Sequence, residues 1–333
     1  MPARPKAIFH PSSVVRDAQA DTYPMPFVPF GWYAVLRSKE LPRNKLASLH
    51  YFGKALIAFR GPDGKATVRD AYCPHYGAHL GGGKLVDGTV ECPFHGWRFD
   101  AQGACVLAPF SQRTPKVSIA GLPVLEHSGL IFVYVGPGEP AWEPKPIPET
   151  VSHQFASPID DRVRVRVHIQ EMRENIVDES HFHYIHKQSE PPIQNLQPDG
   201  PFAELRGRIR RSVLGFELDN TFDCSMYGPG VMVVRTHGRA LSVTAIALTT
   251  PVDDTTSEIR MLYLLRKPAK APFLVPLYKF LFKRLAFPEV RHEMRIWDMK
   301  IHQPRPVMLP HENGIKALRR WYKQFYPVSS DAS

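Results

Sequence analysis

The sequence predicts an α+β protein made of an N-terminal all-β domain and a second domain with an antiparallel sheet and flanking helices. Two observations predict this division. Short strand-like segments with frequent Gly and Pro run from residue 30 to residue 135, whereas longer strands mix with helical segments in residues 150–333. Between them, GPGEPAWEPKPIPE (136–149) has the composition of a linker. Residues 1–29 are expected to form an irregular N-terminal arm.

The strand-like segments of the first domain are separated by turn signals. HYFGKALIAFRG ends in the turn PDGK, and ATVRDAYC, GTVECP, GWRFDAQGACV and HSGLIFVYVG follow it. So many short strands indicate a small all-β domain whose last strand ends near Val135.

The second domain shows both strand and helix periods. RVRVRVHI (162–169) alternates strictly between basic and apolar residues and predicts a strand with one buried face. The other expected elements are a helix at 170–186, long strands at 231–250 and 257–267 joined by the turn PVDDTT, and helices at 271–287 and 290–302.

Charge and composition limit the possible functions. The 42 Lys and Arg residues against 32 Asp and Glu residues give a net charge of +10, which suits a solvated surface or an acidic protein partner. No dense basic run with interleaved aromatic residues is present, so nucleic-acid binding is not expected. No stretch reaches the ~18 apolar residues of a spanning helix, and the first residues do not resemble a secretory signal. Since four cysteines do not suggest a disulfide scaffold, a reducing, cytoplasmic location is expected.

Two Cys/His pairs form the strongest motif in the chain. Cys73-x-His75 is followed, after sixteen residues, by Cys92-x-x-His95. Two thiolates and two imidazoles fit either a zinc ion or a [2Fe–2S] cluster in which histidines hold one of the two irons. Zinc fingers usually group cysteines together and histidines together, whereas each segment here carries one of each. The arrangement therefore favours the cluster.

Three other residues are not expected to be ligands. His79 lies close to the motif but fits neither pair, so it is expected to be a loop or surface residue. Cys105 and Cys224 each stand alone and are expected to be small buried hydrophobic residues.

A second group of candidate ligands stands in ENIVDESHFHYIHK, which contains Asn175-x-x-Asp178-x-x-His181-x-x-x-x-His186. Two histidines and a distant carboxylate form the facial triad of non-haem Fe(II) oxygenases, which leaves positions open for O₂. An ideal helix places His181 and His186 about 140° apart. Both can reach one iron only if the helix bulges or ends between them. His183 is an alternative partner, because His-x-His is also a possible ligand pair.

Together the two motifs resemble those of Rieske-type non-haem iron oxygenases. The two Cys/His pairs followed by Gly96-Trp97 are similar to the cluster motif of that family, and the histidine group lies where the family keeps its catalytic iron. The resemblance implies a Rieske [2Fe–2S] cluster in the first domain and a mononuclear Fe(II) in the second. It favours His181 and His186 over His183 as iron ligands.

The resemblance also implies that the third iron ligand comes from the last of the predicted helices. Similar proteins have an aspartate four residues before a tryptophan, and in HEMRIWDMK the position four before Trp297 is Glu293. Glutamate can ligate iron, although its extra methylene shifts the carboxylate. Asp298 is the alternative, on a different side of Trp297.

Asp178 has a separate role by resemblance. In such enzymes the cluster and the iron of one chain are too far apart for fast electron transfer, and electrons cross to the neighbouring subunit through a buried acid. Asp178 would connect a cluster histidine of one subunit with an iron histidine of the next, and Asn175 of the same motif is placed with it in the catalytic group. The expected assembly is a homotrimeric ring.

The expected function is that of a terminal oxygenase. It would take electrons from a ferredoxin or flavin reductase, ultimately from NAD(P)H, and use O₂ to hydroxylate or desaturate an apolar substrate. VDESHFHYIHK and the ending RRWYKQFYP (319–327) resemble the steroid-acting branch, which includes 3-ketosteroid 9α-hydroxylases and cholesterol 7-desaturases. The alternatives are an aromatic or other small substrate, an electron-transfer iron–sulfur protein without oxygenase activity, and a zinc-bound structural protein.

The segment FLVPLYKFLFKRLAF (273–287) has three open interpretations. It could wall a deep apolar pocket, touch a membrane from which a sterol is drawn, or be a core helix with two exposed basic residues. The second interpretation would place the enzyme at a membrane surface.

Overall fold

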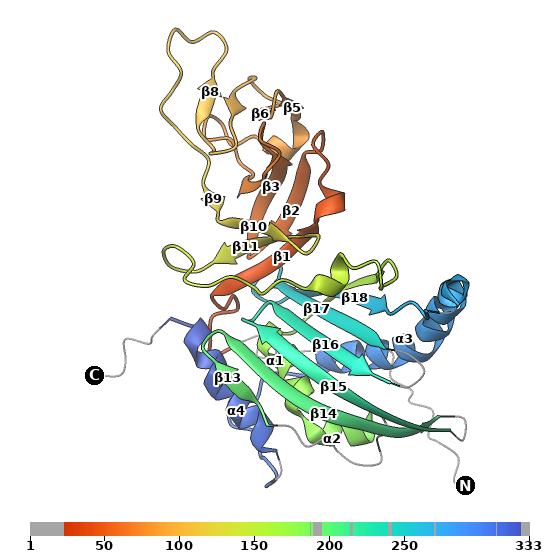
Figure 1. The fold of residues 1–333 in the computed structure, drawn as a ribbon. Coiled ribbons are helices and arrows are strands. Elements are labelled where there is room, and N and C mark those ends of the chain that lie inside the picture. Colours follow the sequence, from red (N-terminus) through yellow and green to blue (C-terminus); the bar gives the residue numbers. More distant parts are fainter. Residues whose placement is uncertain are drawn as a thin grey trace.

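The computed structural model describes residues 23–186, 188, 195–213, 216–238, 242–269, 271–310 and 312–327. The expected N-terminal arm therefore lies mostly outside the described residues. Figure 1 shows two parts: an upper part of small sheets, and a lower part in which helices lie against one large sheet.

The upper part contains three small antiparallel sheets. The first has the order β1 (Gly31–Arg37), β11 (Leu130–Val135) and β10 (Val124–His127). The second has the order β2 (Ala47–Tyr51), β3 (Lys54–Arg60), β4 (Ala66–Asp70) and β9 (Gly121–Leu122). The third has the order β5 (Lys84–Val86), β6 (Thr89–Glu91), β7 (Arg98–Phe99) and β8 (Cys105–Leu107), and it lies at the end of the molecule remote from the large sheet (Figure 1).

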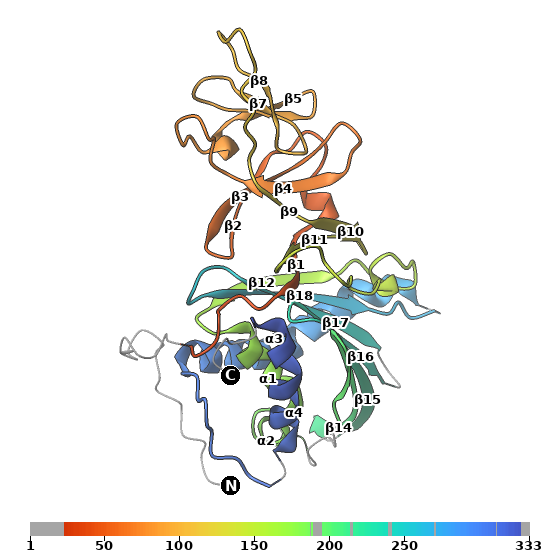
Figure 2. The ribbon, with the colours of Figure 1, turned by 90° about the vertical axis from the view of Figure 1, so that its left-hand side faces the viewer.

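The lower part is built on a seven-stranded antiparallel sheet with the order β12-β18-β17-β16-β15-β14-β13. In chain order its strands are β12 (Ile159–Val165), β13 (Gln197–Asp199), β14 (Phe202–Val213), β15 (Phe216–Tyr227), β16 (Val231–His237), β17 (Val243–Pro251) and β18 (Ser257–Leu265). The helices are α1 (Ile169–Glu174), α2 (Glu179–Tyr184), α3 (Val275–Met299) and α4 (Asn313–Tyr322). Figure 2 shows these helices on one side of the curved sheet.

Short 3₁₀ helices complete the described secondary structure. They are η3 (Ser38–Glu40), η4 (Leu80–Gly82), η5 (Pro148–Thr150), η6 (Asn175–Val177), η7 (Pro272–Leu274) and η8 (Lys323–Phe325). The one that bears on function is η6, because it stands directly between α1 and α2.

Strand β1 joins the two parts through both of its faces. Tyr33 belongs to a buried cluster that reaches Val252, directly after β17, and Trp32 belongs to another that contains Leu262 of β18. A charged contact adds to this apolar interface: the buried Arg260 of β18 lies 2.6 Å from a carboxylate oxygen of Glu40 in the upper part. Burying apolar surface from both parts at once stabilises their mutual arrangement.

Three sequence-based elements differ from the structure. The predicted strand at 231–250 is two antiparallel strands, β16 and β17, because polar residues and Gly238 interrupt the apolar pattern after Val234. The predicted helix at 170–186 is divided into α1, η6 and α2. The two helices predicted at 271–287 and 290–302 are one helix, α3, which continues through Pro288.

Packing on both sides of Pro288 explains why α3 does not stop there. An internal proline removes one helical hydrogen bond and costs about 3 kcal/mol. Before it, Phe282 packs on Tyr263 of β18 with ring centroids 5.0 Å apart. After it, Met294 and Trp297 are buried in the core of the lower part. Together these contacts hold the two halves of α3 on the same sheet.

The structure also bears on two simpler expectations. RVRVRVHI does supply a strand, β12, although it begins at Ile159 and ends at Val165. Among the described residues, no helix is both long and apolar enough to cross a membrane.

Candidate metal centres

Asp178 ends one helical segment and begins the next. Its backbone is extended (φ −89°, ψ 95°), and its side chain accepts a hydrogen bond from the backbone N–H of His181 at 3.3 Å, as the N-cap of α2. The backbone carbonyl of Asp178 lies 2.7 Å from Nδ1 of His181. This contact fixes the ring of His181 so that the other nitrogen, Nε2, faces away from the turn.

The end of α2 brings the second histidine to the same place. The helix ends at Tyr184, between His181 and His186, as the ligand geometry required. The two imidazole rings lie 5.2 Å apart. Without this end, a continuous helix would point the rings in different directions.

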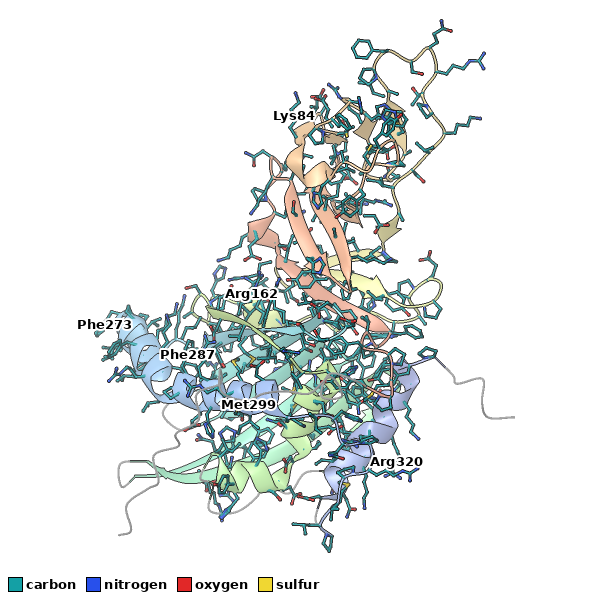
Figure 3. All side chains as sticks on the ribbon, turned by 180° about the vertical axis from the view of Figure 1, so that it is seen from behind. Lys84, Arg162, Phe273, Phe287, Met299 and Arg320 are labelled. Carbon is teal, nitrogen blue, oxygen red and sulfur yellow. The ribbon has the colours of Figure 1, made fainter. Side chains whose placement is uncertain are left out.

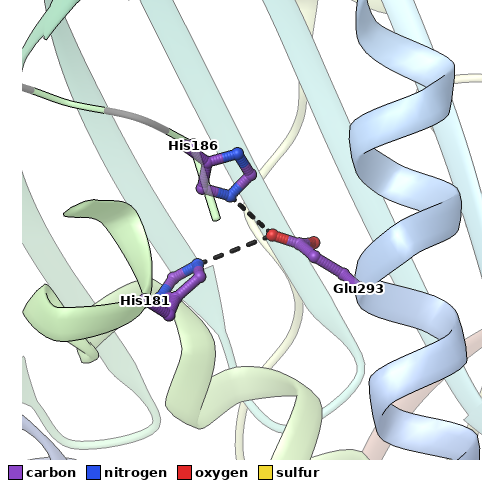
Figure 4. A group of neighbouring side chains, drawn as sticks. All are labelled: His181, His186 and Glu293. Atoms are coloured by element: carbon purple, nitrogen blue, oxygen red, sulfur yellow. Dashed lines mark hydrogen bonds and ion pairs between the residues drawn. The ribbon is translucent and has the colours of Figure 1, made fainter. Parts of the chain in front are cut away.

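Glu293 of α3 completes the group, which Figure 4 shows. Its Oε1 lies 2.6 Å from Nε2 of His186 and 3.5 Å from Nε2 of His181. One atom from each of the three side chains lies within 4.8 Å of the others, a spacing that can hold a metal ion. Asp298 is not in this group: its carboxylate accepts the backbone N–H of Arg166 at 2.9 Å.

Electrostatics within this triad favour a cation. Burial disfavours the charged form of Glu293, but its contacts with His181 and His186 hold the pKa of the carboxyl at about 2. Burial also opposes a charge on His186, but its contacts with Glu289 and Glu293 raise the pKa of the imidazole to about 9. The partly buried carboxylate therefore draws positive charge to the position where its oxygen and the two Nε2 atoms converge. This donor set of two imidazoles and one carboxylate fits a mononuclear Fe(II).

A cavity of about 190 Å³ opens onto the triad. Most of its other lining is apolar and comes from α1, η6, α2 and the sheet; it includes Met172, Ile176, Phe182, Met232, Ile259 and Met261. Such walls exclude water and provide contacts for an apolar substrate.

The other predicted residues of this segment have different surroundings. Asn175 accepts a hydrogen bond from the indole N–H of Trp297 at 3.2 Å, which ties η6 to α3 across the cavity. The carboxylate of Asp178 is partly exposed, and its Oδ2 lies 4.0 Å from Nδ1 of His181. His183 lies outside the triad, and its Nδ1 is 2.8 Å from the carbonyl of Gln188.

The four candidate cluster ligands lie in two loops: Cys73 and His75 between β4 and η4, and Cys92 and His95 between β6 and β7. Cys73 and Cys92 are buried, with 2% and 3% of their surfaces exposed, and contact each other. The rings of His75 and His95 lie 4.7 Å apart, and His95 is exposed. Burial raises the pKa of the Cys73 thiol, while the backbone N–H groups of His75 and Tyr76 act in the opposite direction.

One ring nitrogen of His75 is available to bind a metal. Its Nδ1 is buried and forms no hydrogen bond to any described residue. Its ring stacks on Trp97 with centroids 4.4 Å apart and an interplanar angle of 8°. Because a buried unsatisfied nitrogen is costly, this atom fits a bond to the histidine-held iron of a [2Fe–2S] cluster.

The residues not expected to be ligands are consistent with that interpretation. Cys105 and Cys224 are both buried. His79 caps the 3₁₀ helix η4, where its Nδ1 accepts the backbone N–H of Gly81 at 3.1 Å. His79 is therefore a loop residue with a structural contact.

Comparison with known proteins identifies the family. Residues 31–122 match the Rieske [2Fe-2S] domain, and residues 134–326 match the 3-ketosteroid 9alpha-hydroxylase C-terminal domain. The chain belongs to the 3-ketosteroid 9α-hydroxylase family of Rieske oxygenases. It is an oxidoreductase, the oxygenase component of its system, and it works with a Rieske [2Fe–2S] cluster, a mononuclear non-haem iron, O₂ and a separate electron donor.

Curated relatives of this family resemble the chain over most of its length. The cholesterol 7-desaturase nvd of Bombyx mori is 30% identical over 92% of this chain and 71% of that protein. The 3-ketosteroid-9-alpha-monooxygenase oxygenase component of Rhodococcus rhodochrous is 27% identical over 96% of this chain and 89% of that protein.

Solved structures show the same fold. Dicamba monooxygenase bound to dicamba matches 90% of this chain and 98% of its own, with a TM-score of 0.74 and 18% identity. The predicted fold class, an N-terminal Rieske β domain followed by a catalytic domain with an antiparallel sheet and flanking helices, is confirmed.

Two residues near the metal centres were not found from the sequence. Glu289 lies 3.3 Å from His186, and its spacing of four residues from Glu293 on a helix was the available signal. Trp97 was noted only as part of a motif, and its stacking on His75 depends on the folding of two separate loops.

Proposed function

We propose that this oxygenase hydroxylates or desaturates a neutral, steroid-like substrate at an iron held by His181, His186 and Glu293. The observation that supports this most directly is the convergence of these three side chains at an apolar cavity. When bound there, Fe(II) supplies the activation of O₂, and three protein ligands leave positions open for it. The apolar walls hold the substrate and exclude water.

The cavity supports a neutral substrate over an aromatic acid. Apart from the iron histidines, Arg173 is the one basic residue among the described residues that line it. The guanidinium of Arg173 is buried: its Nη2 donates to Thr249 at 2.9 Å, whereas its Nε forms no hydrogen bond to any described residue. Because the other walls are mostly apolar, burying a carboxylate there costs more than burying an uncharged group. The cavity is also smaller than the roughly 300–1,000 Å³ of typical ligand sites, so a four-ring substrate requires it to widen.

The substrate proposal is tested by turnover with a surrogate reductase and NADH. We expect mass spectrometry to find a hydroxylated or dehydrogenated product from at least one member of a panel of sterols and 3-ketosteroids. Turnover of aromatic acids with none of the steroids would contradict the proposal. Loss of product in His181→Ala, with the visible absorption of the cluster retained, would exclude a protein that only transfers electrons.

We propose that Cys73, His75, Cys92 and His95 hold the cluster and that its electrons reach the iron of a neighbouring subunit. Within one chain the loops that carry these residues lie at the end of the upper part remote from α2 (Figure 1). The exposed His95 and the partly exposed Asp178 can therefore meet only across an interface between copies. A closed ring of three subunits, joined head to tail, would place each Asp178 beside the next cluster.

We propose that the enzyme works in the cytoplasm, at the surface of a membrane that contains its substrate. The first half of α3 does not form a core helix: Leu277, Phe280, Leu281 and Leu285 are exposed, as is Phe273 of the preceding η7, whereas Tyr278 and Phe282 pack on the sheet. Figure 3 shows Phe273, in η7 just before the outer end of this helix, well away from Met299 at the other end.

The charge around these exposed residues favours anionic lipid as the partner of this surface. Lys283 and Arg284 are exposed beside them, and no acidic residue occurs between Glu258 and Glu289. Basic and apolar side chains on one helix bind the interface of anionic bilayers, and each basic residue contributes about 1 kcal/mol there.

Sedimentation with vesicles tests this surface. We expect the protein to bind vesicles that contain phosphatidylglycerol, and Phe280→Ser/Leu281→Ser to reduce the bound fraction at least threefold. Phe110→Ser, which changes an exposed aromatic residue of the upper part, is the matched control and should bind as the wild type does. Equal binding by all variants, or a change in oligomer size without vesicle binding, would contradict a lipid-binding role.

A further inference from the structure

Besides Glu293, a second glutamate of α3, Glu289, has its carboxylate beside the iron triad. Its Oε2 lies 3.3 Å from Nδ1 of His186, while Oε1 of Glu293 lies 2.6 Å from Nε2 of the same ring. Residues four apart lie on the same face of a helix, so α3 presents both carboxylates to one imidazole. Of the two, only Glu293 belongs to the group of three that can share a metal ion.

The two iron histidines are held in different ways. Nδ1 of His181 lies 2.7 Å from the backbone carbonyl of Asp178, at the start of the helix that carries it. His186 lies beyond the end of α2, whose C-cap residue, Ile185, donates its backbone N–H to the carbonyl of His181 at 2.7 Å. The backbone therefore restrains the ring of His181 directly, whereas the ring of His186 depends on a side chain from α3.

We propose that Glu289 is a positioning residue that holds His186 as an iron ligand. Its carboxylate accepts the hydrogen of Nδ1–H, which leaves the lone pair of Nε2 facing the metal position. A carboxylate behind a ligating histidine fixes the ring and increases the basicity of the ligating nitrogen. The inference rests on the proposed assignment of iron to His181, His186 and Glu293.

Metal affinity tests this role without depending on turnover. The protein, stripped of its mononuclear iron but with the cluster intact, is titrated with Co(II), whose visible bands report the ligand set. We expect Glu289→Ala to weaken Co(II) binding by about 10- to 100-fold, the usual effect of removing such a partner. Glu289→Gln, whose amide oxygen can still accept from Nδ1–H, should recover part of that loss.

Two further variants distinguish a wrong assignment of the iron ligands from a wrong role for Glu289. Glu312→Ala removes a carboxylate that accepts from Ser180 of α2 at 3.1 Å but touches no candidate ligand, and its Co(II) affinity should match the wild type. His186→Ala should abolish the site. If His186→Ala still binds Co(II) normally, the assignment of the iron fails. If His186→Ala abolishes binding while Glu289→Ala binds within twofold of the wild type, the role of Glu289 is wrong.

Discussion

The two candidate metal centres are built in opposite ways. The proposed cluster ligands come from two neighbouring loops at one end of the molecule, and one of them, His95, is exposed. The proposed iron ligands come from two helical regions, with His186 and Glu293 107 positions apart in the chain, on the side of the large sheet that the helices cover. The difference suits the two tasks, because an electron carrier must approach a partner closely, whereas oxygen chemistry requires a site from which water is excluded.

The largest expected effect tests whether the two centres are independent. Glu293→Ala should lower product formation more than 100-fold and remove the mononuclear iron, because a triad that loses its carboxylate loses both charge and a ligand. The cluster should remain, since its ligands share no described contact with α3. Iron analysis and visible spectra check this, and simultaneous loss of cluster and iron would show that the two centres are coupled through folding.

A smaller effect, on iron binding, is expected from shortening the side chain of Glu293. Glu293→Asp restores the residue that similar proteins have, but α3 here places Oε1 of the glutamate 2.6 Å from His186. A side chain shorter by one methylene should leave the oxygen short of the two nitrogens and weaken iron binding by about 10-fold. Iron content after dialysis measures the change. Unchanged or tighter binding would mean that α3 shifts to accommodate either residue.

The smallest expected effect is on stability and comes from the charged contact of Glu40 with Arg260 between the upper and lower parts. Burial disfavours a charge on Glu40, but its contacts with Arg260 and the backbone N–H of Arg37 lower the pKa of the carboxyl to about 2. A lowered folded-state pKa stabilises the protein above pH 4.5, and this contribution is lost as pH falls towards 2. Glu40→Gln should therefore lower the free energy of unfolding by about 1–3 kcal/mol at pH 7.

Thermal unfolding at several pH values tests the contribution of Glu40. The difference between Glu40→Gln and the wild type should shrink between pH 4.5 and pH 3. Glu126→Gln, which removes a charged contact with Arg60 inside the upper part, is the comparison for a pair that does not join the two parts. A difference for Glu40→Gln that does not change with pH would argue against an electrostatic origin.

The cluster motif could be found from the sequence because its ligands are close together in the chain. Cys73 and His75 are separated by one residue, and Cys92 and His95 by two, so local spacing carries the chemistry. The end of α2 between the iron histidines could also be predicted, since helical geometry alone does not bring both rings to one metal.

The features that could not be predicted from the sequence depend on contacts that form only on folding. The neighbourhood of Glu289 and His186 arises from the packing of α3 beside α2, which no local pattern encodes. Pro288 is a strong local signal for a helix end, yet the packing of Phe282 on Tyr263 before it and the burial of Trp297 after it outweigh that signal. Strands β14 and β15 were not predicted, although Ala203, Leu205 and Ile209 alternate with charged residues along the first of them.

The transfer of electrons between subunits is tested most directly by mixing two inactive variants. His95→Ala, without a working cluster, and Glu293→Ala, without iron, are co-expressed with different tags and purified as mixed oligomers. In a head-to-tail ring of three, every mixed trimer contains one intact cluster beside one intact iron, so about one third of wild-type activity should return. Mixed trimers that remain as inactive as either parent would contradict the transfer across subunits.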